Sequence, residues 1–122
     1  MNQTKKEHIH FIGIGGSSMS GLAELAVKQG YFVSGSDRIA SDKLKYLSDK
    51  GIHIYPSQSS ENITDDISLV VYTLAVPDSN PELAEVRRRN IPTVERGVYL
   101  GKIASHYKSV SYTHLTLPTK RI

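Results

Sequence analysis

The chain has 122 residues, with 15 Lys and Arg, 12 Asp and Glu, and a formal net charge of +3. This length is enough for one domain with a real core, and the absence of cysteine excludes a disulfide framework and a thiolate metal site. No apolar stretch is long enough to cross a membrane, and residues 1–7 lack the apolar part of a secretory signal, so we expect a cytoplasmic protein with no membrane partner.

The positive charge does not indicate a nucleic-acid partner. Lys120 and Arg121 lie in a C-terminal segment that breaks the pattern of the rest, and without residues 111–122 the chain has 13 basic and 12 acidic residues, a net charge of +1. Nucleic-acid binding needs a more basic surface than that. The one basic run, residues 87–89, falls at the end of an expected helix, where positive charge complements the helix dipole.

Apolar, β-branched runs alternate with helix-type segments along the first 110 residues. In chain order we expect strands at 8–14, 31–36, 52–55, 68–73 and 92–95, and helices at 17–29, 41–50, 81–89 and 98–107. The polar stretch 57–66 has room for a short helix at best. Such alternation predicts an α/β fold, a single Rossmann-like domain with a doubly wound parallel sheet of about five strands.

Residues 111–122 do not continue this alternation, because they have neither strand alternation nor helical spacing. Residues 110–119 resemble one reading frame of a transposon-end sequencing adapter. We therefore expect the domain to span residues 1–110 and residues 111–122 to be a non-native tail. The alternative is a native terminal strand with a frayed end.

A glycine-rich loop separates the first expected strand from the first expected helix. This arrangement places backbone N–H groups and the positive end of a helix around a phosphate. Gly13 can make the tight turn, Gly15 allows a pyrophosphate to approach the backbone, and Gly16 adds a third small residue. The third glycine of the dinucleotide fingerprint G-x-G-x-x-G is replaced by Ser18. We expect a phosphate site here, with plain turn glycines as the alternative.

The residues that follow the loop have two open interpretations. Ser17 and Ser18 either donate hydroxyl hydrogen bonds to a phosphate or cap the helix. Met19, from its chemistry alone, is expected to fill space in the core.

Four further candidates follow expected strands, and the carboxyl ends of parallel strands share one edge of a sheet. Asp37 suits a ribose hydroxyl or a base, or is a loop acid or a cap for the next helix, and Ser36 beside it shares the ligand argument. Thr73 either contacts the ligand or begins the next turn. Arg96 either faces a phosphate or carboxylate or is a solvated surface charge.

Catalytic and metal motifs find no support in the residues. There is no G-x-S-x-G elbow, and no His/Asp pair can be argued from chain order. His8 and His10 alternate on the first strand without a nearby metal-binding partner, so we expect no metal site. From these residues alone, the NAD-binding domain of a dehydrogenase or regulator fits the glycine loop and Asp37 equally well.

Five longer stretches match one known family in order. The opening matches are residues 10–23, HFIGIGGSSMSGLA, and residues 33–37, VSGSD. Further matches are residues 70–73, VVYT, residues 78–83, DSNPEL, and residues 91–96, IPTVER. These stretches resemble the Mur ligases of peptidoglycan synthesis, and in particular the branch that joins L-alanine to UDP-N-acetylmuramate. The resemblance covers about residues 8–110. A sibling branch, which adds a whole tripeptide in recycling, has a similar first domain.

This resemblance implies a three-domain cytoplasmic bacterial enzyme. Its N-terminal Rossmann-like domain is implied to bind the UDP part of UDP-N-acetylmuramate rather than NAD. The loop from Gly13 to Met19 is implied to take the diphosphate, and Ser36 and Asp37 to lie by the uridine.

The family also binds ATP and Mg²⁺, through a G-T-H-G-K-T-type loop in its next domain. There an acyl phosphate of the lactyl carboxylate is attacked by the amine of L-alanine. The resemblance implies a strand at residues 108–110 leading into that loop, but the residues that follow contain no glycine, and residues 119–120 lack the Gly-Lys pair. We therefore expect this chain to be a truncated UDP-sugar-binding domain, with no catalytic residue and no ATP or metal site, inactive alone.

Overall fold

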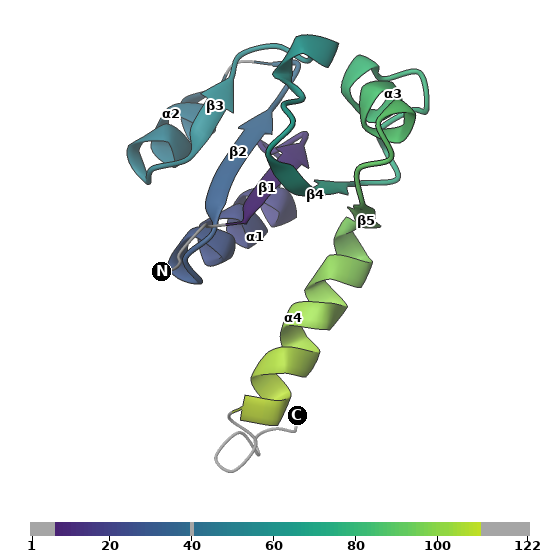
Figure 1. The fold of residues 1–122 in the computed structure, drawn as a ribbon. Helices are drawn as coiled ribbons and strands as arrows, with labels where there is room; N and C mark the ends of the chain where they lie inside the picture. Colours follow the sequence, from purple (N-terminus) through teal and green to yellow (C-terminus); the bar gives the residue numbers. More distant parts are fainter. Residues whose placement is uncertain (1–6, 40, 111–122) are drawn as a thin grey trace.

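The computed structural model of the chain describes residues 7–39 and 41–110 (Figure 1). The expected tail, residues 111–122, lies outside the described residues. The strands are β1 (His8–Ile12), β2 (Phe32–Ser36), β3 (His53–Tyr55), β4 (Ile67–Tyr72) and β5 (Thr93–Glu95). The helices are α1 (Ser17–Lys28), α2 (Asp42–Asp49), α3 (Pro81–Arg88) and α4 (Arg96–Val110), and a 3₁₀ turn, η1, spans Ser60–Asn62.

All five strands pair in parallel in the order β3-β2-β1-β4-β5. The chain builds outward from β1 to β2 and β3, and then returns to place β4 on the other side of β1 (Figure 1). This confirms the predicted α/β fold with a Rossmann-like, doubly wound parallel sheet. The order in which the chain adds strands reverses at β1, so the boundary between β1 and β4 is the topological switch point, where folds of this type bind ligands.

The two faces of the sheet differ in what covers them. Helices α1, α2 and α4 pack on one face in a large apolar cluster that includes Phe11 of β1 and Val71 of β4. Helix α3 and Ile63, just after η1, pack on the other face in a smaller cluster with Ile12 and Val70. The smaller cluster does not fill its face of the sheet. The rest of that face holds four buried polar residues, His8 and His10 of β1 and Ser34 and Ser36 of β2.

Two local expectations are corrected by the structure. The first strand ends at Ile12 rather than residue 14, because Gly13 has a φ of +84°, which turns the chain out of the extended conformation. Residues 108–110, expected as a strand, are the last residues of α4. A helix that has already started gains a hydrogen bond with each added residue, whereas a strand needs a neighbour, and no described strand pairs with residues 108–110.

The basic run at the end of α3 pairs with nearby acids, as its position at a helix end suggested. Arg87 binds Asp78 at 2.7 Å, and Arg88 and Arg89 both reach Glu85. Hydrogen bonds from these two arginines lower the pKa of Glu85 to about 2. Within the described part of the chain, none of the helices combines the length and the apolar character needed to span a bilayer.

Candidate functional site: a cleft at the switch point

A cleft of about 1060 Å³ opens at the carboxyl edge of the sheet. Its walls come from the loops after β1, β2, β3 and β4, and from the start of α3. Among the residues singled out from the sequence, the fold brings five into this lining: Gly13, Gly15, Gly16, Asp37 and Thr73. Loops far apart in the sequence therefore meet where a doubly wound sheet is expected to hold a ligand.

The other five candidates do not line the cleft. Ser17 and Ser18 are exposed at the first two positions of α1, and Arg96 is half-buried as the first residue of α4. Met19 is 1% exposed and belongs to the large apolar cluster, where its own chemistry places it. Ser36 is fully buried and faces α3. A contact between these five and a ligand stays a prediction.

The glycine loop leaves the start of α1 without a side-chain cap. The residue before the helix is Gly16, so of the two interpretations of Ser17 and Ser18, helix capping is wrong. The N–H groups of Gly13 and Ile14 both bind the carbonyl oxygen of Ser36, at 2.8 and 2.9 Å, which ties the loop to the end of β2. The first turn of a helix has N–H groups with no partner inside the helix, and they carry its partial positive charge. This end of α1 can accept an anion.

Asp37 lies against the glycine loop. Its Oδ2 accepts a hydrogen bond from the N–H of Gly15 at 2.7 Å, and its Oδ1 accepts one from Ile39. It does not cap α2, whose preceding residue is Ser41, so that alternative is wrong. A Cβ at Gly15 would lie only 2.6 Å from Asp37 Oδ2. Gly15 therefore allows a close approach, and in this structure the group that approaches is a carboxylate.

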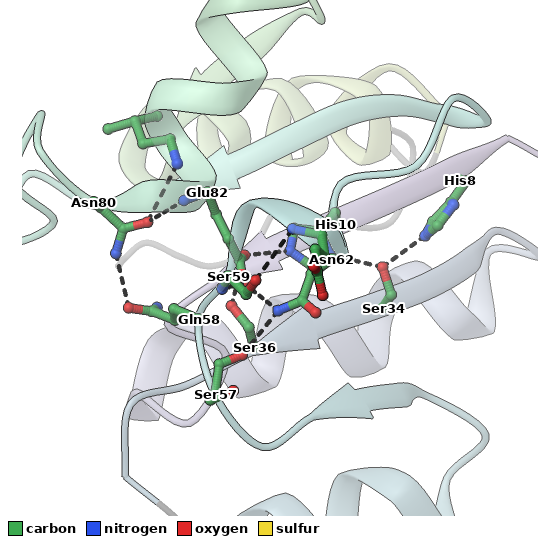
Figure 2. A network of polar contacts seen from close by, with 12 residues as sticks. His8, His10, Ser34, Ser36, Ser57, Gln58, Ser59, Asn62, Asn80 and Glu82 are labelled. Atoms are coloured by element: carbon green, nitrogen blue, oxygen red, sulfur yellow. Dashed lines mark hydrogen bonds and ion pairs between the residues drawn. The ribbon is translucent and has the colours of Figure 1, made fainter.

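Sequence reasoning missed a buried polar network beneath the cleft (Figure 2). Its centre is Glu82 of α3, whose carboxylate and the ring of His10 are both fully buried. Glu82 Oε1 contacts His10 Nε2 and accepts from the Ser36 hydroxyl, both at 2.7 Å. Its Oε2 accepts from the Asn62 amide at 2.6 Å and from the N–H of Ser59 at 3.2 Å. Both carboxylate oxygens are thus saturated.

The network continues along β1 to the surface. His10 Nδ1 contacts the Ser34 hydroxyl at 2.7 Å, and His8 Nε2 contacts the same hydroxyl at 2.6 Å. Since Ser34 has one hydroxyl hydrogen, it donates to one imidazole and accepts from the other. His8 Nδ1 then reaches the exposed Asp66 at 3.1 Å. The signal in the sequence was the polar residue at every second position of two buried strands, which requires buried partners.

Burial and hydrogen bonding oppose each other in this network. Burial would raise the pKa of Glu82, but the hydrogen bonds and charge from His10 and the hydrogen bonds from Asn62 and Ser36 outweigh it, so the pKa lies below its ordinary value. For His8, burial outweighs the hydrogen bond to Asp66 and lowers the pKa. Within residues 7–39 and 41–110, no group of three or more His, Cys, Asp and Glu residues is arranged to hold a metal ion.

Comparison with known proteins adds three findings. Residues 8–108 match the family model described as "Mur ligase family, catalytic domain". A UDP-N-acetylmuramate–L-alanine ligase of Clostridium novyi is 51% identical over 109 residues, which are 87% of this chain and 24% of that protein. The chain spans about a quarter of the length of the curated relatives it matches.

Solved structures agree with this match. The UDP-N-acetylmuramate-alanine ligase of Thermotoga maritima superposes with a TM-score of 0.79 at 36% identity, over 83% of this chain and 23% of that one. A UDP-N-acetylmuramate:L-alanyl-gamma-D-glutamyl-meso-diaminopimelate ligase of Neisseria superposes with a TM-score of 0.75 at 25% identity, over 84% of this chain and 32% of that one.

Proposed function

The chain belongs to the Mur ligase family, and we propose that it binds the UDP part of UDP-N-acetylmuramate. In this proposal, residues 1–110 are the N-terminal Rossmann-like domain of a cytoplasmic, ATP-dependent ligase that joins L-alanine to that sugar nucleotide in peptidoglycan synthesis. The observation that carries it is the cleft at the switch point, with the glycine loop and the uncapped start of α1 on one wall. The 51% identity to the Clostridium novyi ligase supports this substrate.

The diphosphate belongs, in this proposal, at the glycine loop. Gly15 and Gly16 line the cleft beside the start of α1, whose positive end favours an anion. Ser17 and Ser18 are exposed at that helix end and can add hydroxyl donors. Met19 supports the loop from the core.

The uridine belongs, in this proposal, beside Asp37 after β2 and Thr73 after β4. Asp37 and Thr73 line the cleft there and carry the polar atoms that a ribose or a base can bind. Ser36 acts from beneath, through the loop that its carbonyl oxygen holds. Arg96, half-buried after β5, is the remaining candidate for a phosphate or carboxylate of the substrate.

The chemical step belongs to parts of the ligase beyond this domain. ATP supplies the phosphoryl group that activates the carboxylate, and Mg²⁺ accompanies it. The described residues offer no cluster of metal-binding side chains, so no step of that chemistry is assigned to them. With UDP-N-acetylmuramate, L-alanine and ATP present, this chain should release no inorganic phosphate above background. Phosphate release that depends on all three substrates would contradict this assignment.

Calorimetry with UDP-N-acetylmuramate, UDP and NAD tests the binding function. We expect heat from the two uridine compounds and none from NAD. Binding of NAD alone would replace the proposal with a dehydrogenase-type or regulatory domain. Absence of binding to all three, in a sample whose amide spectrum shows a folded protein, would also contradict it. The tripeptide-recycling ligase shares the sugar nucleotide, so a phosphate-release assay on a full-length relative, with L-alanine against tripeptide, separates the two.

A further inference from the structure

Glu82 is linked to three separate walls of the cleft, to two of them through its buried carboxylate and to the third through its backbone N–H. Figure 2 shows these contacts. The first wall is the loop after β3, which contributes Ser57 and Gln58 to the lining. The amide of Asn62 donates both to Glu82 Oε2, at 2.6 Å, and to the carbonyl oxygen of Ser57, at 2.8 Å. The N–H of Ser59 adds a second bond from the same loop to Oε2.

The other two walls are reached from the same residue. The Ser36 hydroxyl donates to Glu82 Oε1, which holds the end of β2 directly before Asp37. The backbone N–H of Glu82 donates to Asn80 Oδ1 at 2.9 Å. The amide group of Asn80 donates in turn to Gln58 Oε1 at 2.7 Å, and both residues line the cleft, so the start of α3 and the loop after β3 are joined in its wall.

We infer that Glu82, oriented by His10, is a positioning residue that sets the relative placement of the loop after β3, the end of β2 and the start of α3 around the ligand. This inference rests on the proposed function, because the test measures the affinity for UDP. Glu82 does not line the cleft itself and is fully buried. Its effect on binding therefore passes through the residues it holds.

Two substitutions at Glu82 separate this positioning from simple packing. Glu82→Leu keeps a similar volume but removes the carboxylate. Four residues then lose their hydrogen bond to position 82: His10, Ser36, Ser59 and Asn62. In Glu82→Gln, the amide oxygen can still accept from Ser59 and Asn62. The amide NH₂ then faces the His10 ring and the Ser36 hydroxyl, both of which can act as acceptors. Glutamine at position 82 is therefore expected to keep the loop after β3 and the end of β2 in place, whereas leucine is expected to leave both without this attachment.

The experiment measures UDP affinity by calorimetry and amide hydrogen exchange by NMR, with the 122-residue chain. For Glu82→Leu we expect UDP binding to weaken roughly tenfold or more, since a buried group loses several charge-assisted hydrogen bonds. The Ser59 amide should exchange much faster, while the amides of Val70 and Val71 in β4 stay protected. Glu82→Gln should restore most of both. Glu85→Gln is the control, because the carboxylate of Glu85 on the same helix binds Arg88 and Arg89 and not the buried network. It should keep the wild-type UDP affinity and Ser59 exchange rate.

Unchanged UDP affinity in a folded Glu82→Leu protein, or equal losses in the leucine and glutamine variants, would overturn the inference. If Glu82→Leu does not fold, Asn62→Ala cuts the link to Ser57 alone, and it must weaken UDP binding for the inference to stand. Failure of the wild-type chain to bind UDP would contradict the proposed function. The Ser59 exchange rates, which need no ligand, would still decide whether Glu82 holds the loop.

Discussion

At the scale of single residues, the contact between Gly15 and the Asp37 carboxylate changes the role of the glycine. The sequence pattern assigned Gly15 to the approach of a pyrophosphate. In the structure, the space beside Gly15 is occupied by the Asp37 carboxylate, which would lie 2.6 Å from a Cβ at that position. Gly15 does not have a positive φ, so an alanine there meets a steric obstacle rather than backbone strain.

Gly15→Ala is therefore expected to lower the free energy of unfolding by about 0.5–1.5 kcal/mol, because the Asp37 carboxylate must rotate away and lose its hydrogen bond from the N–H of residue 15. Combining it with Asp37→Ala removes the carboxylate that the new Cβ meets, so alanine at position 15 should cost less than half as much in that background. Denaturant unfolding of the four proteins in this cycle measures both effects.

UDP affinity in the same cycle separates the two roles of the glycine. If the double variant regains stability but still binds UDP far more weakly than Asp37→Ala alone, Gly15 also makes room for the phosphate. Gly21→Ala is the matched control, because nothing lies within 4 Å of a Cβ there, on the exposed side of α1. An equal cost of Gly15→Ala in both Asp37 backgrounds would contradict the coupling.

At the scale of elements, the start of α3 combines helix capping with shaping of the cleft. Asn80 precedes the helix, and its Oδ1 accepts from the N–H groups of Glu82 and Leu83. Pro81 occupies the first turn, where its missing N–H is no loss. The same Asn80 reaches Gln58 with its amide group, so one residue both starts a helix and closes part of a wall.

Asn80→Ala should destabilise the protein by about 0.5–2 kcal/mol through loss of the cap. Asn80→Ser keeps a capping oxygen, so thermal unfolding should place its stability near that of the wild type. Serine is too short to replace the amide that binds Gln58, so UDP affinity should fall in both variants. Alanine and serine variants of equal stability would show that Asn80 does not act as the cap.

At the scale of the whole molecule, the two faces of the sheet contribute differently to stability. The face under α1, α2 and α4 carries a large apolar cluster, whereas the face under α3 buries two histidines and a glutamate. Burial lowers the pKa of His8 below its value in an unfolded chain. Below that unfolded value, near pH 6.5, the unfolded chain binds more protons than the folded one, and the stability from neutral His8 is lost as the pH falls.

The stability of the wild type, relative to His8→Gln, should therefore decrease between pH 7.5 and pH 5.5. Taking the difference from His8→Gln cancels the titration of groups that the substitution does not touch. Urea unfolding at the two pH values measures it. A difference that is constant, or that grows in favour of the wild type at pH 5.5, would contradict the lowered pKa of His8.

The fold and one half of the candidate site could be predicted from the sequence. The strands, the helices, the parallel sheet and the cleft-lining glycines and Asp37 follow from local patterns: apolar runs, caps and a glycine turn placed between a strand and a helix. These signals are local because each depends on hydrogen bonds and side-chain spacing within a few residues. The meeting of the strand ends at one edge of the sheet could be predicted too, because parallel strands bring their carboxyl ends to the same edge.

Only the tertiary structure decided which polar groups meet inside. Glu82 lies 72 residues from His10 and 46 from Ser36, and no local pattern pairs them. The order β3-β2-β1-β4-β5 brings β1 and β2 together, and the return of the chain lays α3 over them, which turns an ordinary first-turn glutamate into a buried centre. The same packing placed the Asp37 carboxylate against Gly15. The sequence by itself determined the elements and the glycine loop, whereas the contacts between distant elements arose only when burial forced their polar atoms to find partners.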